Sequence, residues 1–311
     1  MATDKKTTLV KKKTTTSLPS LKVLFQDSWE LFHKTILLYG KLLGLNILIS
    51  LGIILVSFIL SIPLFYNLIQ THGNLLHQPT PFVIGSIIFS GLVALVAFVA
   101  LIICGLVFTV AQLLIFKHPQ GASVRSLLGQ SRGYLKRLFL GSLLVAFLSM
   151  GGYFVLIIPG MIINFFLMFT NLEIILENQP IRKSILRSYH IVKSNFWPLL
   201  GRFLLIEVLF IVAQTVIDKV LGNDGILSFV AFVANVAMTW FFLVYFYTMY
   251  RQAKSRTTTT TAPSSSITWM WVLACLGWIL LIIGIVSLWH FLPTLMHSPL
   301  FNPKAIPTGT V

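Results

Sequence analysis

Glu207 is the residue whose type and position suggest chemistry most strongly. It lies nine residues inside an apolar run that begins near residue 198, which places it ~13 Å deep in a helix with a rise of ~1.5 Å per residue. A carboxylate at such a depth in a membrane is costly, and it is usually paired or functional. Two explanations stay open: a polar pocket for an ion, a proton or a lipid head group, or a structural network in which Glu207 is protonated or paired.

Four other polar residues complete this candidate intramembrane site. Arg202 lies five residues before Glu207, and its long side chain is able to reach toward the carboxylate. Glu173 and Asn171 lie near one end of the preceding apolar run, and Asn235 lies in the middle of the following one. We therefore expect a polar site among the fourth, fifth and sixth runs.

No pattern typical of catalysis or metal binding accompanies these residues. The sequence contains no G-x-S-x-G, no Walker loop and no H-E-x-x-H, and His72 and His77 share only a loop. The two cysteines, Cys104 and Cys275, lie in separate apolar runs and have no ligand at C-x-x-C spacing. We predict no catalytic residue, no metal site and no cofactor, and therefore no enzyme.

The composition indicates the elements that must hold the polar residues. Hydrophobic residues make up 56% of the 311-residue chain and charged residues 10%, whereas a soluble domain has roughly 25% charged residues. Seven apolar runs are each close to or above the ~17–25 residues needed to cross the hydrocarbon, so we predict an all-α polytopic transmembrane helical bundle. Thr80-Pro81 is expected to start the second span, and Pro159-Gly160 a tight hairpin at Ile158–Met161 between spans three and four. The runs are 37–66, 83–116, 138–158, 161–177, 198–219, 226–250 and 269–292.

The net charge of +15 follows the membrane topology rather than a nucleic-acid surface. Alternate loops hold 21 of the 23 Lys and Arg residues, all on one side of the seven predicted spans. Since Lys and Arg are retained in the cytoplasm, this predicts a multi-pass protein of the cell membrane with a cytoplasmic N-terminus and an extracytoplasmic C-terminus. No cleavable signal peptide and no nucleic-acid partner are expected.

A basic amphipathic stretch recurs before spans one, three and five. The three copies align on Ser28, Ser131 and Ser188, and each has apolar residues at helical offsets before and after its serine. We predict three repeats of an interfacial amphipathic helix plus a transmembrane hairpin, followed by a seventh C-terminal span. The serine at the centre of each apolar face is suited to close packing against a span.

Cations on these stretches are expected to face the anionic inner leaflet, where each contributes about 1 kcal/mol. The candidate lipid head-group contacts are Lys136, Arg187 and Lys193. The alternative is that the three stretches are only topology-setting loops that fold as helices.

Composition divides the chain into five parts. A seventh span follows a Thr- and Ser-rich linker, with Trp269, Trp271 and Trp289 as interfacial anchors. The predicted parts are a disordered basic cytoplasmic tail (1–20), a six-span membrane module (21–251), the linker (252–268), the seventh helix (269–293) and a short extracytoplasmic tail (294–311).

The segment 159–205 resembles the membrane domain attached to some bacterial glycerophosphodiester phosphodiesterases, and its stand-alone multi-pass relatives of unknown function. The likeness is carried by Pro159-Gly160, a short span ending in Glu177, and Asn195-Phe196-Trp197, with Ser184, Arg187-Ser188 and Val192 between them. It implies a six-span module in a bacterial plasma membrane. It implies no catalysis, because the phosphodiesterase active site belongs to a separate soluble barrel domain, which does not fit in this chain. The linker and the seventh span depart from the family pattern.

These observations favour a non-enzymatic membrane module that binds or organises lipids of the anionic inner leaflet, with protein partners that the sequence does not identify. The alternative is a transporter or lipid translocator that uses the polar site around Glu207. Two features count against it: the predicted repeats are parallel rather than inverted, and no span is broken by Gly or Pro at mid-depth.

Overall fold

The structure of the chain is a computed structural model. It describes residues 18–70, 81–119, 121–221, 225–257 and 267–296.

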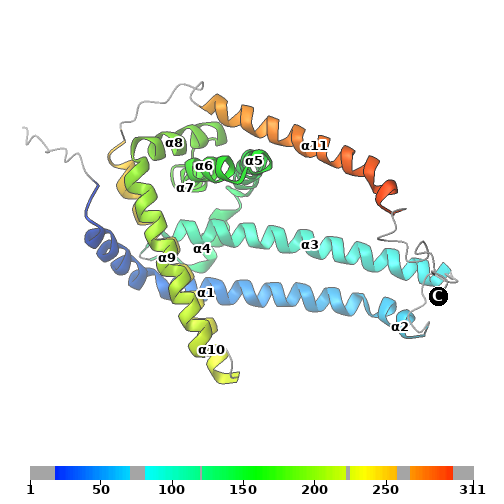
Figure 1. Cartoon of the computed structure of the whole chain (residues 1–311). Coiled ribbons are helices and arrows are strands. Elements are labelled where there is room, and N and C mark those ends of the chain that lie inside the picture. The colour runs from blue at the N-terminus through cyan, green and yellow to red at the C-terminus, as the bar shows by residue number, and fades with distance from the viewer. Residues whose placement is uncertain (1–17, 71–80, 120, 222–224, 258–266, 297–311) are drawn as a thin grey trace, which may run out of the picture. The chain divides into compact units, whose positions relative to one another are not determined.

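The described residues form helices and no strand, so the predicted all-α class is confirmed for them. Seven of the segments are long and apolar enough to cross a membrane, as the sequence predicts. The helices, labelled in Figure 1, are α1 (Leu21–Leu60), α2 (Ile62–Gln70), α3 (Pro81–Ile115), α4 (Val124–Ser131), α5 (Leu135–Val155), α6 (Ile157–Leu167), α7 (Thr170–Leu176), α8 (Ile181–Ser194), α9 (Phe196–Leu221), α10 (Gly225–Lys254) and α11 (Thr268–Met296).

The apolar surface of α1 and α3 is left almost uncovered by protein. Only 6% of the most apolar stretch of each helix is buried, against 33% in α5. A continuous apolar surface of this size is not tolerated in water, but it matches the hydrocarbon of a bilayer, where the helix satisfies its own backbone hydrogen bonds. The chain is therefore an integral, multi-pass membrane protein.

The chain forms two compact units, which we describe separately. The first unit comprises residues Met1–Phe32 and Asn195–Thr258, and the second comprises His33–Ser194 and Thr259–Val311. The first unit contains α9, α10 and the start of α1, and the second contains the rest of α1 and the remaining helices.

The core of the second unit joins α5, α6, α8 and α11. Its buried members include Leu148 of α5, Ile163 of α6, Tyr189 of α8 and Met270 of α11, each at most 6% exposed. The seventh span therefore shares a core with the third and fourth spans.

Glycine allows α5 and α11 to meet at backbone distance. A Cβ added at Gly277 would lie 1.7 Å from the carbonyl oxygen of Gly151, so no side chain fits at this crossing. One turn of α11 earlier, Ala274 packs against Gly151. Small residues at a helix crossing let the two backbones approach closely, which favours association in lipid. The crossing is extended by Trp278, whose indole N–H donates to the Phe147 carbonyl oxygen at 3.1 Å.

The turn between α5 and α6 falls earlier than the sequence predicts. Leu156 is extended (φ −163°, ψ 157°) and separates the helices, whereas Pro159 and Gly160 lie in the first turn of α6. Proline is tolerated in a first turn because its missing N–H has no partner there in any case. Gly160 instead permits close packing of α6 on α5. A Cβ added at Gly152 of α5 would lie only 2.9 Å from the Cα of Gly160.

The start of the first span also differs from the predicted arrangement. The stretch around Ser28 is not a separate helix, because α1 runs without interruption from Leu21 to Leu60. The predicted start of the second span is found at Pro81, the first residue of α3, while Thr80 lies outside the described residues. His72, His77, the tail up to residue 17 and most of the predicted linker and C-terminal tail also lie outside them.

Candidate functional site

The five residues of the predicted intramembrane site are divided between the two units. Arg202, Glu207 and Asn235 belong to the first unit, and Asn171 and Glu173 to the second. We therefore describe these residues one unit at a time.

In the first unit, Arg202 is buried (8% exposed), and its hydrogen bonds go to residues other than Glu207. Its guanidinium donates to Gln252 Oε1 at 3.3 Å and to the carbonyl oxygen of Pro19. Gln252 Nε2 in turn donates to Asp27 Oδ2 at 3.4 Å. This network ties the start of α1 to α9 and α10, which indicates a structural role for Arg202.

Glu207 is half-buried on α9, and it has no hydrogen bond or ion pair to any residue that the structure describes. Asn235 is half-buried on α10, and within the described residues its buried Oδ1 atom likewise has no hydrogen-bond donor. Both groups lie within candidate membrane spans.

In the second unit, Glu173 is fully buried and forms an ion pair with Arg187. Its Oε2 atom lies 3.6 Å from Arg187 Nε, and the Arg187 side chain is 33% exposed. Asn171, on the same short helix α7, accepts a hydrogen bond from the Ser142 hydroxyl at 3.3 Å. Arg187 therefore places one nitrogen beside an internal carboxylate, while a third of its side chain stays exposed.

The fourth span is interrupted between α6 and α7. Ser188 of α8 stabilises the break, because its hydroxyl donates to the Phe166 carbonyl oxygen at 2.9 Å and accepts from the Phe169 N–H at 3.1 Å. The prediction that no span is broken at mid-depth considered only Gly and Pro, and this break involves neither. All three aligned serines, Ser28, Ser131 and Ser188, are fully buried.

The two predicted lysine contacts lie on the surface of the second unit. Lys136 of α5 and Lys193 of α8 are both exposed. The ammonium group of Lys193 lies 5.6 Å from the centre of the Tyr189 ring, at cation–π distance. Neither lysine lines the pocket described next.

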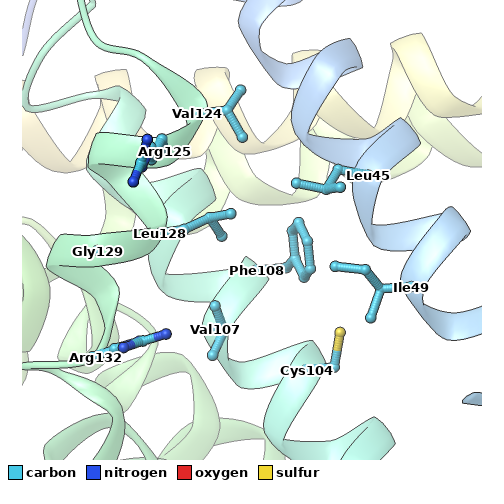
Figure 2. Close-up of a pocket in the computed structure, with 10 residues that line it drawn as sticks. All are labelled: Leu45, Ile49, Cys104, Val107, Phe108, Val124, Arg125, Leu128, Gly129 and Arg132. Atoms are coloured by element: carbon cyan, nitrogen blue, oxygen red, sulfur yellow. The ribbon is translucent and has the colours of Figure 1, made fainter.

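A pocket of about 830 Å³ lies between α1, α3 and α4, and we call it the basic pocket. Its apolar wall includes Leu45 and Ile49 of α1, Phe108 of α3 and Leu128 of α4. Figure 2 shows its two arginines, Arg125 and Arg132, on the side of α4, across the pocket from α1. The pocket combines two fixed positive charges with an apolar wall.

The local sequence explains the position of the two arginines. Gly121 takes a positive φ of 86° in the turn after α3, and the Ser123 hydroxyl caps α4 by accepting from the Ser126 N–H at 3.2 Å. Arg125 and Arg132 are seven residues apart, so they lie two turns apart on one face, ~10 Å along the axis. Both side chains are exposed, and neither has an acidic partner among the described residues.

Two unpaired guanidinium groups beside an apolar wall are suited to an anionic amphiphile. Arginine presents N–H donors in a planar fork that matches phosphate oxygens, and it pairs with them bidentately. The pocket offers no group of three or more His, Cys, Asp or Glu residues, and none is found elsewhere in the described part of the chain.

The sequence prediction counted Arg125 and Arg132 among the basic loop residues but did not select them as head-group contacts. Their i, i+7 spacing on a serine-capped helix with apolar Val124 and Leu128 is the signal that could have identified them. Only the structure shows that α4 covers a space between α1 and α3.

Comparison of the chain with protein-family models, with curated proteins and with solved structures found no match. The resemblance to the membrane domain of glycerophosphodiester phosphodiesterases stays a prediction from the sequence.

Proposed function

We propose that this integral membrane protein is a non-enzymatic module that binds an anionic lipid and places its head group in the basic pocket. The observation that carries the proposal is the pairing of Arg125 and Arg132 with an apolar wall in a single pocket of about 830 Å³. A free phosphate would use the arginines and leave the wall of Leu45, Ile49 and Phe108 exposed, whereas an amphiphile uses both.

The distribution of charge supports the cytoplasmic leaflet as the source of the lipid. Arg125 and Arg132 belong to a loop that the charge count predicts to be cytoplasmic, and this leaflet carries the anionic lipids. The same reasoning favours the cell membrane, and the resemblance favours a bacterial one. Protein partners that use the bound lipid as part of an interface are compatible with this role.

Native mass spectrometry of the purified protein in mild detergent tests the proposal with two variants of equal charge. One is Arg125→Ala/Arg132→Ala in the basic pocket, and the other is Lys136→Ala/Lys193→Ala on the exposed surface. Both remove two positive charges, so they test the position and type of the cation at equal net charge. The probes are phosphatidylglycerol and phosphatidylcholine.

The wild type is expected to retain phosphatidylglycerol in preference to phosphatidylcholine. The arginine variant should lose about tenfold or more of that retention, because each charge-assisted hydrogen bond contributes roughly 1.5–3 kcal/mol. The lysine variant should stay within about twofold of the wild type, because neither Lys136 nor Lys193 lines the basic pocket. Equal losses in the two variants, or a loss only in the lysine variant, would remove the basic pocket as the site.

A second candidate function, transport or lipid translocation, rests on Glu207 and Asn235. The observation in its favour is that both present polar groups without a partner among the described residues, inside membrane spans. Glu207→Gln should leave phosphatidylglycerol retention unchanged and have no effect on lipid movement in reconstituted vesicles if the protein only binds lipid. Loss of a measurable flux in Glu207→Gln, with Asp218→Asn as control, would favour the second function.

A further inference from the structure

An apolar groove continues from the basic pocket along α1 and α3. It is a cavity of about 510 Å³ lined by residues of α1 between Ile49 and Leu60 and of α3 between Leu92 and Ala100. Ile49 lines both this cavity and the basic pocket, so the two spaces adjoin. We call this cavity the α1–α3 groove. The two helices that form it run side by side in Figure 1.

Small side chains leave the groove empty of protein. Gly52 of α1 and Ala97 and Ala100 of α3 line it, and a Cβ added at Gly52 would meet no atom within 4 Å. Val56 of α1 and Val96 of α3 are exposed at its edge, so the groove opens sideways toward the surroundings of the spans. A ligand in the bilayer would therefore have lateral access to it.

The lining of the groove is chemically suited to hydrocarbon. Ser57 is its one polar residue, and the Ser57 hydroxyl donates to the Ile53 carbonyl oxygen at 2.7 Å within α1. No unpaired hydroxyl, amide or charge is thus offered to an ion or to a chain of water molecules. The polar groups are concentrated at the other end, in Arg125 and Arg132 of the basic pocket.

The length of the α1–α3 groove matches one lipid chain. From Ile49 to Leu60, its first and last lining residues on α1, the helix axis rises ~16 Å at ~1.5 Å per residue. One leaflet of a bilayer is ~15 Å of hydrocarbon deep, half of the ~30 Å core, and this is the depth that an acyl chain reaches. A head group at the arginines leaves room for a whole chain along the groove.

We propose that the α1–α3 groove holds one acyl chain of the anionic lipid whose head group lies in the basic pocket, so that the ligand is a long-chain anionic phospholipid taken laterally from the bilayer. This inference rests on the proposed function and deepens it, because it makes chain length a second determinant of binding. A helix of another protein or a second copy of this chain would fill the groove without needing the arginines, and the charge at one end favours the lipid.

A groove-filling variant, Gly52→Leu/Ala97→Leu, tests the inference separately from the head-group site. The matched control is Gly85→Leu, since Gly85 is an exposed glycine of α3 with nothing within 4 Å of an added Cβ, and it lines neither the groove nor the basic pocket. Native mass spectra are recorded with dioleoyl- and dihexanoyl-phosphatidylglycerol, which share a head group and differ in chain length.

The groove-filling variant is expected to lose about tenfold of its retention of the dioleoyl lipid, because each excluded methylene forfeits its burial, and to keep its retention of the dihexanoyl lipid. Gly85→Leu should retain both lipids as the wild type does. Undiminished dioleoyl retention in the groove-filling variant would overturn the inference, as would an equal loss of both lipids. Failure of the proposed function has a different signature, namely retention of both lipids by Arg125→Ala/Arg132→Ala. Dimers that replace bound lipid in the wild type would assign the groove to a second copy and also overturn the inference.

Discussion

The guanidinium of Arg187 compensates a carboxylate that is fully removed from solvent. Glu173 has no exposed surface, and its Oε2 atom lies 3.6 Å from Arg187 Nε. Desolvation of a carboxylate costs free energy, so the fold is destabilised if the compensating cation is removed. The pair joins α7 to α8 beside the break in the fourth span.

Arg187→Ala should therefore destabilise the protein rather than change its lipid binding. Removing the charged partner of a fully buried carboxylate is destabilising, which predicts a lower Tm in detergent. The double variant Glu173→Gln/Arg187→Ala should recover part of that loss, because no unpaired charge is left buried. Unchanged Tm together with lost phosphatidylglycerol retention would contradict this assignment and restore Arg187 as a head-group contact.

The candidate site was only partly predictable from residue types. Glu173, Arg187 and the three serines stand out by type and spacing, and the structure buries the carboxylate and the serines. Arg125 and Arg132 carry a weaker signal in their i, i+7 spacing after Ser123, and the space between α1 and α3 that α4 covers is known only from the structure. A cavity of this kind depends on contacts between distant segments, which periodicity does not encode.

At the scale of the elements, the crossing of α5 and α11 determines whether the seventh span belongs to the bundle. Gly277→Ala should disrupt it, because an added Cβ would lie 1.7 Å from the Gly151 carbonyl oxygen. Overpacking of this kind typically costs about 1–3 kcal/mol of unfolding free energy. A contact with backbone is relieved only by moving a helix, so we expect a lower Tm in detergent.

The matched control is Gly284→Ala on the same helix, where an added Cβ meets nothing within 4 Å. It should leave the Tm unchanged or slightly raised, since alanine is the better helix former. Equal Tm values for the two variants would show that α11 does not pack on α5 as described.

The spans themselves were predictable because hydrophobic length is a property of the sequence alone. All seven predicted runs have a counterpart among the candidate spans of the described residues. Two local features were not predicted. The turn at Leu156 falls before Pro159 because proline is placed in a first turn, and the break at Phe169 depends on Ser188, which is a tertiary contact.

At the scale of the whole molecule, the chain presents two kinds of surface to a membrane, one apolar and one basic. The spans α1 and α3 expose apolar side chains along most of their length, while Arg125 and Arg132, on and directly after α4, have no acidic partner within the described residues. A bilayer supplies a complement to each surface, because its hydrocarbon contacts the apolar spans and its anionic head groups attract the arginines. The central claim is therefore that an anionic lipid occupies the basic pocket.

Alkylation of Cys104 tests that claim most directly, because this thiol lines the basic pocket and donates to Asn46 Oδ1 at 3.6 Å. In Cys275→Ser it is the one thiol left in the chain, so its reaction with N-ethylmaleimide is read from total mass. Phosphatidylglycerol should slow the reaction several-fold while phosphatidylcholine does not, and Arg125→Ala/Arg132→Ala should abolish the protection. An alkylation rate that phosphatidylglycerol leaves unchanged in the parent protein would contradict the account.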